Sequence, residues 1–354
     1  MLRTLPALLV LALSFRSASA SPPSGLLLGQ RTADESRYHT LWIYDAGQQI
    51  RIVVVPDLLL PRENGFWRIG GYRTLETLQT DEELDFPRQN EKFTIEESDI
   101  WLAPLRQTPS IVLTPNQELT THHLDWPCES TDREITFVNP THIWYRADSD
   151  VACGVHPDRY IKLYAAPLES LLTRLKISQI LGESGVEAYH QAVAAAWRKA
   201  NKEAGFECEP TEDPSNWNIA RGRGKWKVTG WADTHRLCGY GLDLEIPIEL
   251  PPSITGYDRL LKPWTELEAE IPGLLDAFSS PTNGLLVATT KEAVMVYRPQ
   301  RAKIGPPVVR YPVLADTAVM AQWAVGARSV ARWTKEVEST REVHPLVRHR
   351  GNAK

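Results

Sequence analysis

The sequence lacks most of the motifs by which catalytic sites are recognised. It has only four cysteines in 354 residues and no C-x-x-C pair, so neither a zinc ribbon nor a thioredoxin-like site is predicted. It contains no H-E-x-x-H motif and no phosphate-binding loop. The nearest approach to G-x-S-x-G is centred on Ser184, but Val186 stands where the last glycine belongs. The adjacent His122-His123 has no second ligand pair nearby. We therefore predict no catalytic, metal or cofactor site.

Long apolar segments and a basic charge balance are also missing. After the amino terminus, no segment stays apolar for the roughly 18 residues that a membrane-spanning helix needs. The chain has 39 Lys and Arg residues against 44 Asp and Glu residues, a net charge of −5. A dedicated nucleic-acid binder needs a net basic surface that releases counterions. We expect no nucleic-acid partner and no transmembrane segment in the mature chain.

The first twenty residues have the pattern of a signal peptide. Arg3 supplies the positive start, Leu5 to Leu13 is a short apolar stretch, and Ala18-Ser-Ala20 offers the small side chains that signal peptidase accepts. The apolar stretch is too short to span a bilayer, although an uncleaved anchor is the alternative. We expect cleavage after Ala20 and a secreted or periplasmic protein. Loss of Arg3 and Arg16, with no acidic residue, would move the net charge from −5 to −7.

An even number of cysteines in an oxidising compartment predicts disulfide bonds. The four are Cys128, Cys153, Cys208 and Cys238. The first two lie at similar distances on either side of a predicted turn at Asn139-Pro140. The second two flank a predicted turn at 221–224 in the same way. Residues equidistant from a hairpin turn meet across the two strands, so we predict the disulfides Cys128–Cys153 and Cys208–Cys238.

Many short strands separated by turn signals account for most of the chain. Strands are predicted at 40–44, 49–55, 66–69, 100–102, 110–113, 135–138, 143–146, 160–165, 217–220, 225–231, 242–248, 285–289, 294–297, 308–313, 319–323 and 330–333. Gly65-Phe-Trp-Arg-Ile resembles Gly224-Lys-Trp-Lys-Val, and each follows a turn, which favours repeated units. We predict a mainly β fold with a helical insertion, built as a propeller-like array of short antiparallel strands. A two-domain α+β arrangement is the alternative.

One region departs from the strand pattern. Pro167 suits a first helical position, and the leucines that follow it have i, i+3, i+4, i+7 spacing. A second apolar stripe runs from Val186 to Ala200, after an interruption at Gly182 to Gly185. The predicted organisation is a signal peptide at 1–20, a linker at 21–39, a β-rich domain at 40–334 with a helical insertion at 167–205, and a loose tail at 335–354.

The most suggestive surface is the predicted hairpin around residues 221–231. Alternation places Lys225 and Lys227 on one face of its second strand, with Trp226 and Val228 on the other. Cationic side chains near aromatic rings suit an anionic glycan or peptidoglycan, and a half-buried strand with a solvated face is the alternative. The candidate ligand contacts are Arg221, Arg223, Lys225, Trp226, Lys227 and Trp231.

Two stretches resemble known groups of proteins. The run Leu60-Pro-Arg-Glu-Asn-Gly-Phe-Trp-Arg68 resembles a segment of uncharacterised exported bacterial proteins. Residues 135–171 are more loosely similar to extracellular envelope domains of the anti-sigma-factor type, through Ile135-Thr-Phe-Val138 and Leu168-Glu-Ser-Leu171. Together the two stretches cover under a fifth of the chain. The resemblance implies a non-catalytic envelope module and transfers no active-site residue.

Two function classes are compatible with these features. The first is an exported, non-catalytic binding or structural module of the cell envelope, with an unidentified envelope protein or polysaccharide as partner. The twelve tryptophans favour it, because rigid aromatic side chains contribute much of the affinity at binding surfaces. The alternative is a secreted glycan or ester hydrolase with acidic residues dispersed over its loops. A glycosidase of that kind needs two carboxyl groups about 5–10 Å apart.

Overall fold

The computed structural model describes residues 21–32, 38–47, 49–79, 92–107, 110–111, 129–151, 158–171, 173–204, 209–234, 241–300, 303–313, 315 and 317–340. The predicted signal peptide at 1–20 lies outside the described residues. Within them, no helix combines the length and the apolar character that crossing a bilayer would require.

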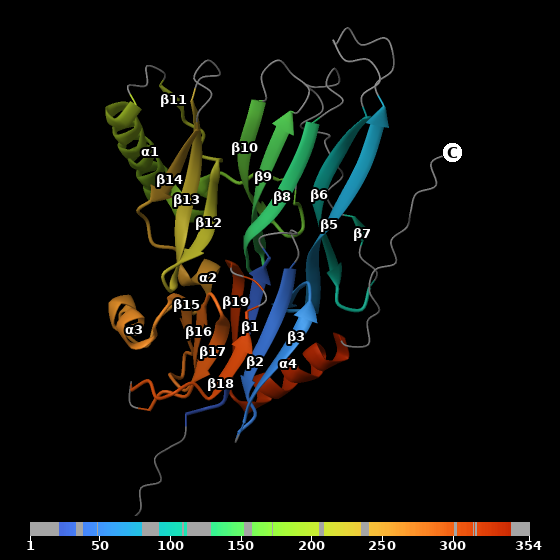
Figure 1. Ribbon diagram of the computed structural model, residues 1–354, viewed down its shortest axis with the longest axis vertical. Helices are drawn as coiled ribbons and strands as arrows, with labels where there is room; N and C mark the ends of the chain where they lie inside the picture. Colours follow the sequence, from blue (N-terminus) through green and yellow to red (C-terminus); the bar gives the residue numbers. More distant parts are fainter. Residues whose placement is uncertain are drawn as a thin grey trace, which may run out of the picture.

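Five small antiparallel sheets form a five-bladed β-propeller (Figure 1). Blade A has the order β19 (Thr317–Val325), β1 (Ser24–Arg31), β2 (Tyr38–Asp45), β3 (Ile50–Pro56), and blade B has β4 (Leu58–Arg62), β5 (Gly65–Gln79), β6 (Lys92–Pro104), β7 (Ser110–Ile111). Blade C consists of β8 (Glu129–Val138), β9 (His142–Val151) and β10 (Asp158–Pro167). Blade D consists of β11 (Pro210–Thr211), β12 (Trp217–Gly222), β13 (Lys225–Thr234) and β14 (Gly241–Ile246), and blade E of β15 (Leu274–Ser279), β16 (Leu286–Thr290), β17 (Ala293–Tyr297) and β18 (Val309–Pro312). The predicted propeller-like array is confirmed.

The ring closes in blade A, where strands from both ends of the described chain lie side by side. β19 pairs antiparallel with β1, and this places Val325 opposite Ser24 and Thr317 opposite Arg31. β19 also lies against β8 and β12, the first strands of blade C and of the main hairpin of blade D. The carboxyl-terminal strand therefore completes the blade that the amino-terminal strands begin, as closed β architectures require.

Blade A is buried on both faces. Leu26 and Leu28 of β1 join a hydrophobic cluster shared with blades C, D and E, whereas Leu27 joins a second cluster shared with blades B and C. Alternate residues of a strand point to opposite faces, which explains this division. Gly25 permits the close packing, because a Cβ there would lie 2.2 Å from Cη2 of Trp42.

The predicted hairpins around Asn139-Pro140 and 221–224 are confirmed as β8–β9 and β12–β13, and β4–β5 and β16–β17 also pair as antiparallel neighbours. The four cysteines lie outside the described residues, so the two disulfides stay predictions. The strand ends that flank the cysteines are paired: Glu129 lies opposite Val151, and Pro210 lies opposite Thr234.

The expected linker at 21–39 is wrong over most of its length. Ser24–Arg31 forms β1, whose side chains are nearly all buried, and β2 begins at Tyr38. The run Gly25-Leu-Leu-Leu28 is apolar throughout, because this strand is covered on both faces. A strand of that kind lacks the polar–apolar alternation that marks a half-buried strand in a sequence.

The expected strand at 330–333 is also wrong. The expected loose tail at 335–354 is wrong for residues 335–339, which are helical. Ala327–Ser339 forms the helix α4, while residues 341–354 lie outside the described part. Val330, Trp333 and Val337 of α4 are buried in the cluster shared by blades A and B. Their i, i+3, i+7 spacing is that of one helix face, which a four-residue window cannot display.

The helical insertion begins later than predicted. Pro167 belongs to β10, and the following turn is held to the blade by the backbone bond from Leu175 N–H to Ala165 C=O (2.8 Å). The helix α1 spans Ile177–Ala204 and packs against β14. Gly182, with φ 67° and ψ −165°, breaks it at the predicted interruption. Two unpredicted short helices, α2 (Pro252–Thr255) and α3 (Trp264–Glu270), lie between blades D and E in sequence.

Candidate functional site

The hairpin of β12 and β13 ends in a two-residue turn, Arg223-Gly224. Both residues have positive φ, 50° and 77°, which is the geometry of a type I′ turn and matches the twist of the flanking strands. Glycine is needed at the second position for a further reason: an added Cβ would lie 2.5 Å from Cδ1 of Leu260. The tip of the hairpin is therefore set both by the turn type and by close packing.

Side chains alternate along β13 as predicted. Trp226 is buried, whereas Lys225 is exposed and Lys227 is half-buried on the opposite face. The Lys227 ammonium donates to Oε1 of Glu245 on β14, at 2.7 Å. This bond and the charge of Lys227, with smaller effects from Lys225 and Arg223, lower the pKa of Glu245. Lys227 thus binds this carboxylate directly, and the charges of Lys225 and Arg223 act on it more weakly.

This cationic face borders a cavity of about 660 Å³, which lies between the hairpin and the chain segment 247–259. The residues that line it include Lys225, Trp226, Lys227 and Glu245 on the blade D side, and Glu249, Tyr257, Asp258 and Arg259 on the other. The volume is within the range of roughly 300–1,000 Å³ that is typical of ligand sites. We name the hairpin site as Arg223, Lys225, Lys227 and Glu245 with this adjoining cavity.

Arg221 lies beneath the hairpin site and is closed to ligands. Its side chain is only 3% exposed. The guanidinium donates to both carboxylate oxygens of Asp276, at 3.0 and 3.2 Å, and to Asp258 and the Ala277 carbonyl. It also lies over the ring of Phe278, 4.3 Å from the centroid. The prediction that Arg221 contacts a ligand does not fit this burial.

Asp276 connects the tip of the hairpin to blade E. Its Oδ1 accepts hydrogen bonds from the backbone N–H groups of Gly224 (3.0 Å) and Ala277 (2.8 Å). Burial raises the pKa of the Asp276 carboxyl, while Arg221 and the two N–H groups act in the opposite direction. Because the Asp276 carboxylate binds both the turn and Arg221, the tip of the hairpin is held in position against blade E.

Trp231 lies apart from the lysines. Its Nε1–H donates to Oδ1 of Asp233 at 2.7 Å, and its ring covers Gly241, where a Cβ would lie 1.7 Å from Cζ2 of the indole. It lines a separate cavity of about 230 Å³ between blades C and D. Only part of the predicted contact set is therefore assembled: Lys225 and Lys227, with Trp226 behind them and Arg223 at the adjacent turn.

Among the residues that the structure describes, burial raises the pKa of two carboxyl groups, and each is paired with an arginine. Asp57 is bound by Arg68, and Asp276 by Arg221. Neither lines the cavity of the hairpin site or the cavity beside Trp231. Among the described residues, no group of three or more His, Cys, Asp or Glu side chains is placed to hold a metal ion.

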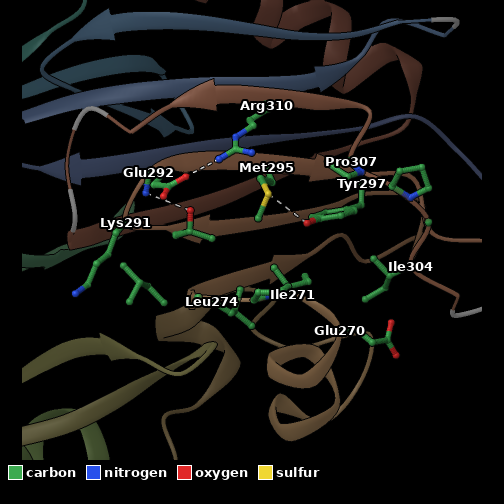
Figure 2. A pocket seen from close by; sticks show the side chains of 16 residues that line it. Glu270, Ile271, Leu274, Lys291, Glu292, Met295, Tyr297, Ile304, Pro307 and Arg310 are labelled. Carbon is green, nitrogen blue, oxygen red and sulfur yellow. Dashed lines mark hydrogen bonds and ion pairs between the residues drawn. The ribbon is translucent and has the colours of Figure 1, made fainter.

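A further cavity, of about 690 Å³, lies on blade E (Figure 2). Met295 and Tyr297 of β17 form one wall, and Ile271 and Leu274, just after α3, face them from the other. We name it the blade E groove. Sequence reasoning missed it, because β17 was predicted but α3 and β15, which supply the opposite wall, were not.

Neither a scan against protein-family models nor a search of curated proteins finds a match for this chain. The resemblances of residues 60–68 and 135–171 to exported and envelope proteins therefore stay predictions.

Proposed function

We propose that this protein is an exported, non-catalytic binding module of the cell envelope, and that its hairpin site holds an anionic envelope polymer such as peptidoglycan. One observation carries the proposal. Lys227 binds Glu245 at the edge of a cavity of about 660 Å³, Lys225 lines the same cavity, and Arg223 lies at the adjacent turn. A ligand that brings carboxylates of its own would compete with Glu245 for these cations.

The ion pair already present is a weak competitor. Glu245 is 71% exposed and Lys227 is 32% exposed, and a pair of this kind is worth only about 0–1 kcal/mol. A polymer with several carboxylates can engage the three cations together, and multivalent contact raises affinity without any single strong bond. The rigid turn and its anchor at Asp276 reduce the ordering cost of binding.

Export is proposed from the amino-terminal sequence, and the position of the first strand is compatible with it. β1 begins at Ser24, so cleavage after Ala20 would leave every residue of blade A on the mature chain. The partner would then meet the protein outside the cytoplasm, where cell-wall polymers lie.

The test separates binding from turnover. Purified protein beginning at Ser21 is incubated with insoluble peptidoglycan, with soluble polysaccharides, and with a panel of chromogenic glycosides and esters. We expect saturable retention on peptidoglycan and no release of chromophore. Turnover that disappears when one Asp or Glu is changed to Ala would instead establish the hydrolase alternative. Absence of retention on every anionic polymer would contradict the hairpin site.

A further inference from the structure

Blade E leaves part of one face open. Residues of this face, including Leu286 and Ala288, form a small hydrophobic cluster that Leu267 of α3 covers. α3 has only seven residues, and beyond its end Met295 and Tyr297 line the open groove. Met295 is half-buried there and Tyr297 is nearly covered, so the face is open mainly at Met295.

The lining of the groove is mainly apolar. Ile271, Leu274, Met295 and Ile304 point into it, and Tyr297 adds an aromatic wall (Figure 2). The Tyr297 hydroxyl donates to Sδ of Met295 at 3.4 Å, and a thioether is a weak acceptor. At about 690 Å³, the space has the size and the lining that are usual for a small-molecule site.

The rim of the groove carries both acidic and basic side chains, and most of them form ion pairs. Glu270 pairs with Lys262, and Arg310 lies 2.7 Å from Glu292. Lys291, at the opposite end of the groove from Glu270, is exposed and has no ion-pair partner among the described residues (Figure 2). The groove therefore offers one uncompensated positive charge at one end of an apolar channel.

The outer strand of the blade disfavours a peptide as occupant. β18 is only four residues long, Val309–Pro312, and only Val308 separates it from Pro307. Proline at both ends blocks extension of the strand ladder, which is how exposed edges avoid pairing with another chain. Two of the three large apolar side chains that are exposed in the described chain, Leu275 and Val308, lie in or next to the lining of the groove.

We infer that the blade E groove binds a single-chain anionic amphiphile, an aliphatic chain that ends in a carboxylate. The chain would lie against Met295 and Ile304, the half-buried apolar side chains of the lining, and the carboxylate would meet the ammonium of Lys291. The inference is independent of the hairpin site, because the two cavities share no lining residue.

The test is calorimetric titration of the mature protein with laurate, kept below its micelle concentration. We expect one saturable site, at least tenfold weaker in Met295→Trp, which fills the groove, and at least threefold weaker in Lys291→Gln. Lys303→Gln is the matched control, since Lys303 is exposed in the connection between β17 and β18 but does not line the groove. Dodecanol, which has no charge, should bind wild type and Lys291→Gln equally.

The contrary outcomes are distinct. No binding of laurate, or equal affinity in wild type and Lys291→Gln, would overturn the inference. Tighter binding of dodecyltrimethylammonium than of laurate would do the same, because it would reverse the charge preference. Should Met295→Trp fail to give a cooperative thermal transition, the comparison of Lys291→Gln with Lys303→Gln decides alone.

Discussion

At the scale of single residues, Arg221 joins two blades. Its guanidinium binds Asp276 of β15 and Asp258 of the segment before α3, and its own strand belongs to blade D. All three side chains are largely shielded from water. Removing one partner from a buried charge network leaves the others uncompensated, which is more costly than the pair itself is favourable.

Arg221→Ala should therefore lower the free energy of unfolding by about 3–5 kcal/mol, because two buried carboxylates lose their counterion. Urea titration followed by tryptophan fluorescence measures the change. Lys225→Ala, at an exposed position on the next strand, is the control and should stay within about 0.5 kcal/mol of wild type. A loss below about 1 kcal/mol in Arg221→Ala would show that the network is dispensable.

His39 gives a prediction about pH. It is 9% exposed, its Nε2 lies 3.3 Å from Oε1 of Gln30, and burial lowers its pKa. As the pH falls below about 6.5, the unfolded chain takes up the proton before the folded chain does, so stability is lost in that range. His39→Gln should lose less stability between pH 7 and pH 5 in denaturant titrations. Identical losses in the two proteins would contradict this account of His39.

At the scale of secondary-structure elements, turn residues and polar–apolar alternation predicted most of the strands correctly. A strand that is buried on both faces was not predicted, because it lacks this alternation. The β12–β13 hairpin was predictable because Arg223-Gly224 can adopt positive φ and the lysines alternate with apolar residues. β1 was not, since a strand covered on both faces has no alternation. The buried role of Arg221 depends on aspartates distant in sequence, so no local pattern reveals it.

The first predicted disulfide belongs to the β8–β9 hairpin. Glu129, which follows Cys128, lies opposite Val151, two residues before Cys153. We expect a Cys128–Cys153 peptide in non-reducing peptide maps of the exported protein. The bond would close a loop worth about 3–4 kcal/mol in the chain-entropy model, so Cys153→Ala should destabilise the protein by that order. A peptide joining Cys128 to Cys208 would refute the hairpin argument.

The second predicted disulfide, Cys208–Cys238, follows from the pairing of β11 with the end of β13. Pro210 lies opposite Thr234, so the chain enters and leaves blade D at neighbouring positions. Non-reducing peptide maps of the exported protein should contain a peptide joined by Cys208–Cys238. Maps of the protein made in a reducing cytoplasm should lack it. Free thiols at both positions in the exported protein would show that the pairing is wrong.

At the scale of the whole molecule, the pairing of β19 with β1 closes the ring, and we expect stability to depend on it. A chain truncated after Pro312 lacks β19 and α4, and we expect it to lose its cooperative thermal transition because blade A exposes an apolar edge.

A permuted chain restores the closure. Val325 lies opposite Ser24, so residues 317–325 can be moved ahead of Ser24 and joined to it through Asn-Gly as a hairpin. That permuted chain, still without α4, should regain a cooperative but weaker transition. A cooperative transition in the truncated chain would mean that closure is not needed.

Export is a property of the whole chain and can be tested on it directly. Mass spectrometry of protein recovered from the periplasm or the medium should identify Ser21 as the first residue. The reason is the small-x-small pattern that ends at Ala20 after a short apolar stretch. Intact Met1 in the exported fraction would be the contrary result.

The measurement that tests the central claim most directly is the affinity of the mature protein for soluble peptidoglycan fragments, as a function of salt concentration. The hairpin variant combines Arg223→Asn, Lys225→Gln and Lys227→Gln. The control variant removes the same charge from exposed positions of α1, with Arg198→Asn, Lys199→Gln and Lys202→Gln. We expect the hairpin variant to bind at least tenfold more weakly with a shallower salt dependence, and the control variant to bind like wild type. Equal losses in both variants, or no loss in either, would contradict the account.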